Sequence, residues 1–363
     1  MRSLDIVHLG KFYPPEFGGI ESVTEALAVD HAQDGHRIEV LCFTRTTPGT
    51  ETAGNLTIRR YATLSEVSSQ PMSLRYMTDG IKRARTADIL HVHTPNVLAA
   101  FVALFSARKT RIVVHWHADI EGKGMLGRLI RPIQSLLLKR ANAIVATSQA
   151  YTEASPPLIA HAEKISVIPI GIADIEGGSQ RTAVKPDQIL FVGRLVPYKG
   201  LPVLFRAMAK MTRPARLVVV GSGPERKSLE ALANDLNLSD RIDFLGKADQ
   251  SALLELFQVS TVFCLPSINR LEAFGVVLLE AMRAGCPAIS SDIPGSGVSW
   301  VNQSGMTFDL CDHDGLAARL DQVLADPNLR EKYAQMARDR YEDEFGREKM
   351  SRRFLDLYAS ILP

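Results

Sequence analysis

Short β-branched runs alternate with amphipathic segments of helical length along the whole chain, and this alternation restricts the fold more than any other feature. The first half carries runs such as DIVHLG, DILHVHT and RIVVHWH, and the second half continues with QILFVGR, ARLVVVG and TVFCLP. Parallel neighbouring strands need a crossover of a dozen or more residues, which is usually a helix. The pattern therefore predicts two α/β units, each a doubly wound parallel sheet of the Rossmann type.

Chain length and a change in composition predict where these units begin and end. The chain has 363 residues, 46% of them hydrophobic, which is more than one domain of ordinary size needs. Residues 174–188 are rich in glycine and polar side chains and lack periodicity, so we predict a linker there. The N-terminal domain then spans 1–173 and the C-terminal domain 189–345. A last helix within 346–363 could pack on either domain, including back on the first.

Several functional classes are disfavoured by composition. No apolar run approaches the ~20 residues that span a bilayer, and the first strand contains Asp5 and His8, unlike a signal peptide, so we expect a cytoplasmic protein. The four cysteines form no CxxC pair, which predicts reduced, buried thiols rather than a zinc site or disulfides. The basic residues are not interleaved with aromatic ones, so we expect no nucleic-acid partner.

The stretch SINRLEAFGVVLLEAMRAG places two glutamates in an otherwise apolar segment. Eight residues turn an α-helix about 80° beyond two full turns, so Glu272 and Glu280 do not share a helical face. A helix that begins between Phe274 and Val276 leaves Glu272 in the loop, Glu280 one turn inside, and the first N–H groups free for an anion. A structural interpretation stays equally open: Glu272 favours the helix dipole, and Glu280 pairs with Arg283 or Arg194.

Several segments together resemble the retaining GT-B glycosyltransferases of family 4. The segment EAFGVVLLE is similar to the E-x7-E motif of that family, and LGKFYPPEFGGIESVTEALA is similar to its N-terminal glycine-rich loop. VVHWHAD resembles its active-site histidine strand, and FVGRLVPYKGLPVLFRAM and LVVVGSGPERKSLEALA resemble its donor-binding segments. The resemblance covers nearly the whole chain in the order of the family. It implies two Rossmann-like domains that face each other across a cleft holding the active site.

The resemblance also implies roles for charged side chains. Arg194 and Lys199 would clamp the donor diphosphate, where fixed cations stabilise the charge of the leaving group. Glu272 would bind hydroxyls of the transferred sugar, and Glu280 would accept from the ribose. His117 would lie against the donor sugar, whereas His115, on the same face of the strand, would be structural. The transfer would proceed on the front face, without a covalent intermediate on the enzyme.

The remaining donor contacts that the resemblance implies are glycines and backbone groups. They are Gly18, Gly19, Gly223, Lys247, Ala248, Phe274, Gly275 and Val276. Gly18 and Gly19 also fit a plain loop-to-helix turn, or a turn that needs positive φ. The run GSGPER lacks the third glycine of a dinucleotide fingerprint, so a nicotinamide cofactor is disfavoured.

No metal or cofactor is expected. The run Asp312–His313–Asp314 imitates a metal-binding DxD, but it precedes a helical segment where aspartates are ordinary caps.

An anionic membrane is a further expected partner. Residues 70–140 hold 12 basic and four acidic side chains. Within this range the helix at 125–140 carries an apolar stripe that fits either a membrane or the core, with Pro132 expected to kink or restart it. The stripe comprises Leu126, Leu129, Ile130, Ile133, Leu136 and Leu137. The protein would then work at the cytoplasmic face of an inner membrane.

The sequence therefore predicts a retaining hexosyltransferase. It would move a hexose, with mannose and a GDP donor favoured over UDP, from a nucleotide diphosphate sugar to a glycan or lipid-linked acceptor in surface polysaccharide or O-antigen synthesis. Two other functions stay open. One is a nucleotide-sugar epimerase of the same double-Rossmann plan, and the other is a non-catalytic subunit that binds nucleotide sugars.

Overall fold

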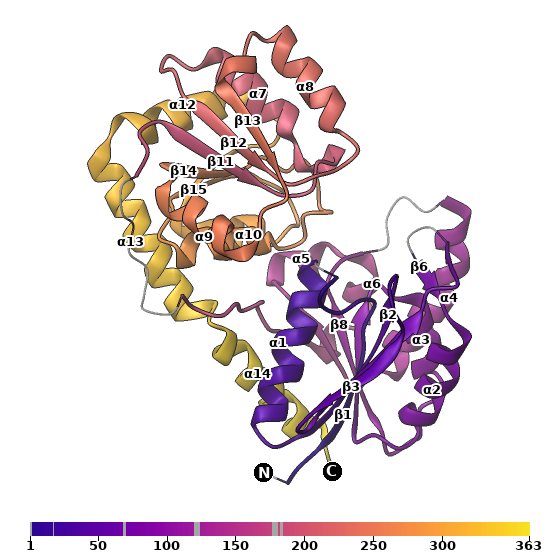
Figure 1. The fold of residues 1–363 in the computed structure, drawn as a ribbon. Helices are drawn as coiled ribbons and strands as arrows, with labels where there is room; N and C mark the ends of the chain where they lie inside the picture. Colours follow the sequence, from indigo (N-terminus) through magenta and orange to yellow (C-terminus); the bar gives the residue numbers. More distant parts are fainter. Residues whose placement is uncertain (1, 17, 68–69, 120–123, 176–180, 182–183) are drawn as a thin grey trace. The chain divides into compact units, whose positions relative to one another are not determined.

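The structure is a computed structural model that describes residues 2–16, 18–67, 70–119, 124–175, 181 and 184–363, with side chains in the fourth helix from Ile130 onward. The chain forms two compact units (Figure 1). Unit 1 comprises Met1–Gly171 and Arg347–Pro363, and unit 2 comprises Ile172–Gly346. Each unit is a doubly wound, Rossmann-like α/β layer structure, as the strand and helix alternation predicts.

Unit 1 is built on an eight-stranded sheet with the order β10-β9-β8-β7-β1-β2-β4-β3. All neighbours pair in parallel except β3 and β4, and β5 and β6 form a separate antiparallel hairpin. The strands are β1 (Asp5–Leu9), β2 (Arg37–Thr44), β3 (Gly49–Ala53), β4 (Leu56–Ala62), β5 (Ser65–Val67), β6 (Gln70–Met72), β7 (Ile89–Thr94), β8 (Arg111–Trp116), β9 (Ala143–Ala146) and β10 (Ile165–Val167). The hydrophobic pattern did not predict the antiparallel additions, because β3 is exposed at every residue and has no apolar face.

The helices of unit 1 are α1 (Gly19–Gln33), α2 (Leu74–Ala84), α3 (Val97–Ala103), α4 (Gly124–Arg140), α5 (Gln149–Ala154), α6 (Pro156–Ile159), the 3-10 turn η1 (Ala162–Lys164) and α14 (Arg347–Ile361). Helices α1, α2, α3 and α5 of unit 1 pack against strands of this sheet, and further helices complete the unit. In α1 the face formed by Val23, Leu27, Ala28 and His31 is buried, at 2% exposure or less for each residue.

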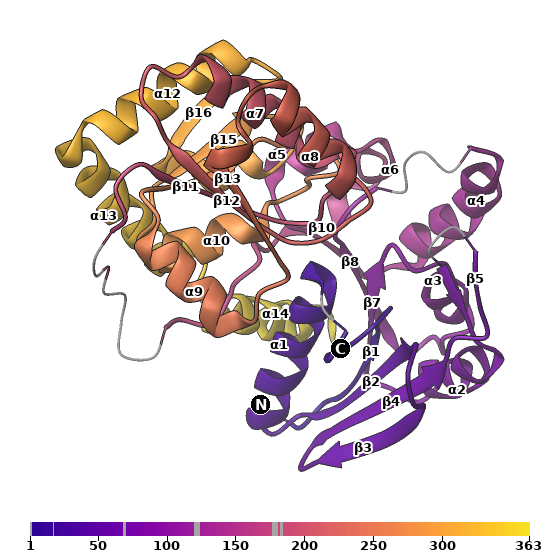
Figure 2. The same cartoon turned by 45° about the horizontal axis from the view of Figure 1, so that its top comes forward.

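Helix α14 lies beside α1 in both ribbon views, although more than 300 residues separate them in the sequence (Figures 1 and 2). Arg347 forms an ion pair with Asp30 of α1 at 2.6 Å, and its guanidinium also donates to the Ala26 carbonyl. Phe354 and Tyr358 are fully buried against the strands. Unit 1 is thus completed by the last helix of the chain.

Helix α4 departs from the expected stripe. It runs through Pro132 as one helix. Ile130 and Leu137 of the stripe are buried, but Leu136 is 50% exposed, and Leu138, outside the stripe, is buried. Leu126 and Leu129 lie outside the described side chains. The described part of the stripe is therefore only partly in the core, since Ile133 is half-buried. No helix in the described part of the chain is long and apolar enough to cross a bilayer.

Unit 2 contains a six-stranded parallel sheet with the order β13-β12-β11-β14-β15-β16. Its strands are β11 (Gln188–Val192), β12 (Arg216–Val220), β13 (Ile242–Gly246), β14 (Val262–Leu265), β15 (Ala288–Asp292) and β16 (Met306–Asp309). Its helices are η2 (Pro197–Lys199), α7 (Leu201–Lys210), α8 (Arg226–Asp235), η3 (Ser239–Arg241), α9 (Gln250–Val259), α10 (Val276–Arg283), α11 (Val298–Val301), η4 (Asn302–Ser304), α12 (His313–Ala325) and α13 (Pro327–Glu344).

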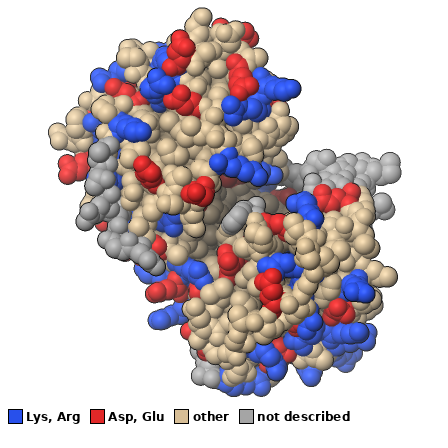
Figure 3. Space-filling view, in the orientation of Figure 1, with Lys and Arg blue, Asp and Glu red and all other residues tan. Residues whose placement is uncertain are grey.

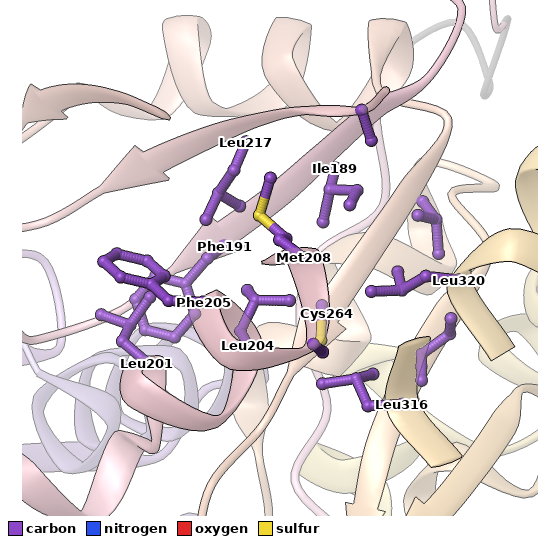
Figure 4. Packing of buried hydrophobic residues seen from close by; sticks show 14 of the residues in the cluster. Ile189, Phe191, Leu201, Leu204, Phe205, Met208, Leu217, Cys264, Leu316 and Leu320 are labelled. Carbon is purple, nitrogen blue, oxygen red and sulfur yellow. The ribbon is translucent and has the colours of Figure 1, made fainter. Parts of the chain in front are cut away.

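One face of this sheet packs against α7 and α12, and Figure 4 shows the resulting core. Phe191 and Leu217 from the strands meet Leu204 and Met208 from α7, and Leu316 and Leu320 from α12 complete the layer.

The cysteines are free thiols, and three of them are buried as predicted. Burial in the core raises the pKa of the Cys42 thiol to about 12 and of the Cys286 thiol to about 11. The prediction was wrong for Cys311, which is exposed in a turn with φ of 63°.

The predicted linker, 174–188, lies partly outside the described residues, which omit 176–180 and 182–183. Its described residues are tied to unit 2. Asp174 forms an ion pair with Arg338 at 2.5 Å, and Arg181 donates to the carbonyls of Gln258, Ser260 and Gly285.

Candidate active site

In the sheet of unit 2, the order in which successive strands are added reverses between β11 and β14. These two strands are neighbours although β12 and β13 separate them in the sequence. Loops from the two strands diverge at such a switch point and leave a crevice at the carboxyl edge, where ligands of open α/β sheets bind. Lys199 follows β11, and Glu272 follows β14. The switch point therefore brings together two residues that the sequence singled out separately.

Lys199 and Glu272 form a buried ion pair, with Nζ and Oε2 2.5 Å apart and each residue 8% exposed. The Ser267 hydroxyl donates to the same carboxylate oxygen at 2.8 Å, and the Ser296 hydroxyl donates to the Glu272 backbone carbonyl at 2.5 Å. The Lys199 and Ser267 contacts hold one oxygen of the carboxylate, and the Ser296 contact holds the backbone of the same residue. The sequence predicted both residues as ligand contacts but did not show that they pair, because 73 positions separate them.

Backbone hydrogen bonds join the loop that follows β11 to the loop that follows β12. Leu195 donates to the Ser222 carbonyl at 3.0 Å and accepts from the Glu225 N–H at 3.1 Å. A Cβ on Gly223 would lie 2.2 Å from the Leu195 carbonyl oxygen, so only glycine fits this approach. Gly223 therefore has a packing function in addition to the expected ligand contact. Arg194 directly precedes Leu195 in the same loop. It is exposed and donates to the Tyr198 hydroxyl at 3.2 Å.

Helix α10 begins at Val276, inside the predicted window, and starts directly after this ion pair. Its N-cap is Gly275 with φ of 78°, a conformation that glycine adopts without strain, and it has no side-chain cap. The first N–H groups of an uncapped helix lack intrahelical acceptors and carry the positive end of the helix dipole. Phe274 and Val276 flank Gly275 at this end, so the backbone there is suited to an anion such as phosphate.

Glu280 lies one turn inside α10 and is partly buried. Burial raises the pKa of its carboxyl to about 7, against a smaller opposite effect of the nearby Arg283 guanidinium. The alternative ion pairs with Arg283 or Arg194 are not formed in the described part of the chain, where the Arg283 guanidinium donates to the Ala173 carbonyl at 3.0 Å. A carboxyl held in an apolar setting without an ion-pair partner is a common feature of ligand-binding positions.

Two expected contacts lie at the same edge of the sheet, farther from the switch point. Lys247 and Ala248 follow β13, the strand at one end of the sheet, and Lys247 is exposed.

The Asp312 carboxylate accepts from the N–H groups of Asp314 and Gly315 at 3.1 and 2.9 Å. Asp312 is thus the N-cap of α12, as predicted for this aspartate-rich run.

In unit 1, Gly18 is the N-cap of α1, which begins at Gly19. Gly18 has φ of −177°, which is extended backbone, so the interpretation that this glycine takes positive φ was wrong. Helix α1 has no side-chain cap either, and it begins at the carboxyl edge after β1, next to the switch point between β1 and β7.

His117 directly follows β8 and is 7% exposed. Burial lowers the pKa of its imidazole to about 3. Its Nε2 lies 3.1 Å from Nδ1 of His93 on β7, a residue that the sequence analysis missed together with His8 and His91. The signal was present in the runs DIVHLG, DILHVHT and RIVVHWH, which carry histidines near the ends of three strands. His115 stacks on His117 with ring centroids 4.0 Å apart.

Comparisons with known proteins show the family of the chain. The family described as "Glycosyl transferases group 1" matches residues 174–340, and the "Glycosyl transferase 4-like domain" matches residues 18–171. The chain is 31% identical to the O-antigen chain mannosyltransferase C of Escherichia coli, over 98% of both chains. It is 33% identical to the D-rhamnosyltransferase WbpZ of Pseudomonas aeruginosa, over 83% of this chain and 81% of that one.

Solved structures show the same fold. Sucrose-phosphate synthase from Thermosynechococcus elongatus superposes with a TM-score of 0.80 at 20% identity, over 98% of this chain and 99% of that one. HepE from Anabaena, in complex with UDP and glucose, also gives a TM-score of 0.80, at 19% identity over 98% and 100% of the two chains. The fold is GT-B, and the chain belongs to the group 1 glycosyltransferases of family 4. It is therefore a glycosyltransferase.

Because Lys199 and Glu272 form an ion pair at the switch point, we expect substitutions of the two residues to have non-additive effects on the free energy of unfolding. Lys199→Met or Glu272→Gln alone should destabilise unit 2 by roughly 3–5 kcal/mol, because each leaves a buried group without its partner. The double variant should cost at least about 1 kcal/mol less than the sum of the two. Urea unfolding measures all three. The exposed pair Arg216–Asp243, tested with Arg216→Met and Asp243→Asn, is the control and should show a coupling below about 1 kcal/mol. Additive effects at the buried pair would contradict this assignment.

The raised pKa of Glu280 predicts a pH-dependent cost of folding. Its pKa is about 7 in the folded chain against an ordinary value of 4.5, so the folded state favours the protonated carboxyl. The stability that this group contributes is complete below pH 4.5 and is lost as the pH rises through 7. Glu280→Gln should therefore match the native melting temperature at pH 5 and exceed it by ~2 °C or more at pH 8.5. Glu255→Gln, at an exposed position of α9, controls for net charge and should show no such divergence.

Proposed function

We propose that the protein transfers a hexose from a nucleotide diphosphate sugar to a hydroxyl, with retention at the anomeric carbon. The observation that carries this proposal is the buried Lys199–Glu272 pair at the switch point, directly before the uncapped start of α10. A cation and free N–H groups suit a diphosphate, and a fixed carboxylate beside them suits sugar hydroxyls. The HepE complex with UDP and glucose supports a nucleotide-sugar donor for this fold.

The donor-side residues have distinct functions in this proposal. Lys199 and Arg194 neutralise charge on the departing nucleoside diphosphate, and the amides of Phe274, Gly275 and Val276 bind the distal phosphate and the sugar. Glu272 accepts from sugar hydroxyls, and its bond to Ser267 keeps it oriented. Glu280 accepts from the ribose. Gly223, Lys247 and Ala248 contribute backbone contacts to the nucleotide.

The reaction itself forms a bond between the acceptor oxygen and the anomeric carbon as the bond to the diphosphate breaks on the same face. The acceptor proton passes to the leaving phosphate, so no enzyme carboxylate becomes covalently attached. In unit 1, His117 with Gly18 and Gly19 would contact the substrates. No metal ion or cofactor is needed for these steps.

Relatives support a more specific substrate proposal. The Escherichia coli relative is named as an O-antigen chain mannosyltransferase, and the Pseudomonas aeruginosa relative as a D-rhamnosyltransferase. We therefore propose GDP-mannose as donor and a growing glycan or lipid-linked saccharide as acceptor, in surface polysaccharide or O-antigen synthesis at the cytoplasmic face of the inner membrane.

A thermal-shift panel of GDP, UDP, ADP and their sugars tests donor binding. A GDP-sugar should raise the melting temperature of the native protein by several degrees, as expected when the ligand concentration is far above the dissociation constant. Lys199→Ala should abolish the rise, whereas Lys332→Ala, at an exposed position of α13, should retain it. Products from a positive donor and an acceptor library are then analysed by NMR for anomeric configuration. An inverted product, a free epimerised sugar, or binding with no transfer to any acceptor would each contradict the proposal.

A membrane contact through unit 1 is part of the same proposal. Four apolar side chains around the β5–β6 hairpin and the start of α2 are exposed: Leu64, Val67, Met72 and Leu74, at 73%, 49%, 38% and 62%. Arg75 is exposed next to them and suits an anionic headgroup. On the face that Figure 3 shows, basic and acidic side chains are interspersed, so the proposal relies on this apolar hairpin rather than on a continuous basic surface.

Co-sedimentation with anionic vesicles tests this contact. The native protein should bind, and Leu74→Asp combined with Arg75→Glu should reduce binding ~10-fold or more, because both the apolar burial and ~1 kcal/mol of headgroup attraction are lost. Leu245→Asp alters a comparably exposed leucine of unit 2 and should leave binding unchanged. Equal binding by all three proteins would exclude the hairpin as the membrane contact.

A further inference from the structure

Five buried histidines share one face of the unit 1 sheet. They come from three adjacent parallel strands, and the strand register places them next to one another: His8 of β1 is opposite His91 of β7, and His93 is opposite His115 of β8. His117 extends the set just beyond β8. The ring of Phe354, from α14, covers this face, with centroids 5.2 Å from His91 and 5.0 Å from His115.

The rings form two hydrogen-bonded rows. In the first row, Nδ1 of His8 lies 3.1 Å from Nε2 of His93, and Nδ1 of His93 lies 3.1 Å from Nε2 of His117. In the second, the Tyr358 hydroxyl lies 2.5 Å from Nδ1 of His91, whose Nε2 lies 3.3 Å from Nδ1 of His115. Only the first row ends at the residue expected to contact the substrate. We call it the His8–His93–His117 row.

The same nitrogens are near enough to one another to suggest a metal ion, but their orientation fits hydrogen bonds better. His8, His91 and His93 form one such group, and His93, His115 and His117 form another. A metal needs bare nitrogens that converge on one point ~2.0–2.1 Å from each. In this row the nitrogens of successive rings lie 3.1 Å apart, a hydrogen-bond distance that leaves space for one proton between them.

Burial favours the neutral form of all three rings of the row. Burial lowers the pKa of His8 and of His117 to about 3, and the pKa of His93 lies well below its ordinary value through burial and then through His8 and His117. A neutral imidazole has one N–H and one bare nitrogen. Because His93 uses both nitrogens within the row, it must donate to one neighbour and accept from the other. The protons of the whole row therefore point in one direction.

The direction is set by the far end of the row. Nε2 of His8 is buried and has no hydrogen-bond partner among the described residues. A buried N–H without an acceptor is rarer in proteins than an unsatisfied acceptor, so Nε2 of His8 is the bare nitrogen. His8 then donates from Nδ1 to His93, His93 donates from Nδ1 to His117, and the proton of His117 lies on its own Nδ1.

We propose that His8 and His93 are positioning residues that hold His117 as a neutral donor with its proton on Nδ1. With its proton on Nδ1, His117 donates from Nδ1 to a ligand oxygen and cannot remove a proton through Nδ1. The identity of the oxygen as a hydroxyl of the donor sugar rests on the proposed function. The row itself does not, since it follows from contacts inside unit 1.

The tautomer can be measured on the free protein. Histidine labelled with ¹⁵N gives two-bond ¹⁵N–¹H correlations that distinguish a protonated from a bare ring nitrogen, and the spectrum of His117→Asn assigns the His117 signals by their loss. We expect His117 to be protonated at Nδ1 and bare at Nε2. A proton on Nε2, or a doubly protonated ring at neutral pH, would overturn the proposal. So would one equivalent of zinc displacing the protons of the row.

Two substitutions of His8 separate positioning from a general structural effect. His8→Leu removes the first donor and should leave His117 as a mixture of tautomers. His8→Asn can place an amide N–H near the position of the lost Nδ1 and should restore the single tautomer. His161→Asn, outside the row, should change none of these signals, and circular dichroism verifies that each variant folds.

Activity gives a second readout once a donor is identified. We expect kcat/KM to fall by up to ~10-fold in His8→Leu, the scale of one hydrogen bond, and to recover in His8→Asn. Equal losses in both variants would contradict positioning by a donor at His8. If the spectra match the expectation but no nucleotide sugar is turned over, the proposed function fails while the row stands.

Discussion

Parallel strand pairing is the constraint on which both units depend. It aligns the carboxyl ends of neighbouring strands, and a doubly wound order then opens one switch point in each sheet, between β1 and β7 and between β11 and β14. Residues from distant parts of the chain meet at these edges only because the strands run in the same direction. The Lys199–Glu272 pair in unit 2 and the histidine row in unit 1 are both consequences of this one arrangement.

The buried polar groups of the candidate site lower the stability of the fold. An ion pair, a carboxyl with a raised pKa and several neutral imidazoles occupy positions where apolar side chains would pack without desolvation cost. The neighbouring cores offset this cost, as the layer of Phe191, Leu204 and Leu320 illustrates. Groups that a stable core does not require, gathered at the edge where ligands bind, are typical of a functional site.

Much of this architecture could be predicted from local patterns. Strand and helix alternation predicted the two doubly wound units, and the sequence predicted the start of α10 between Phe274 and Val276, where the structure has it. Chemistry that depends on pairing across the sheet could not be predicted in this way. His8 and His93 are 85 positions apart, and only the parallel register brings their rings together. Similarly, the apolar stripe of α4 did not show that Leu138 rather than Leu136 would be buried, because that depends on where α3 packs against the helix.

The docking of α14 on unit 1 has a consequence for how the protein is made. The strands with the five histidines leave the ribosome early, but Phe354 and Tyr358, which cover them, follow only after the 175 residues of unit 2, from 172 to 346. At ~5–20 residues per second, synthesis of that insertion takes on the order of 10–35 s. For that interval the nascent first domain has a polar, uncovered sheet face, so its final folding step must wait until the second domain has been translated.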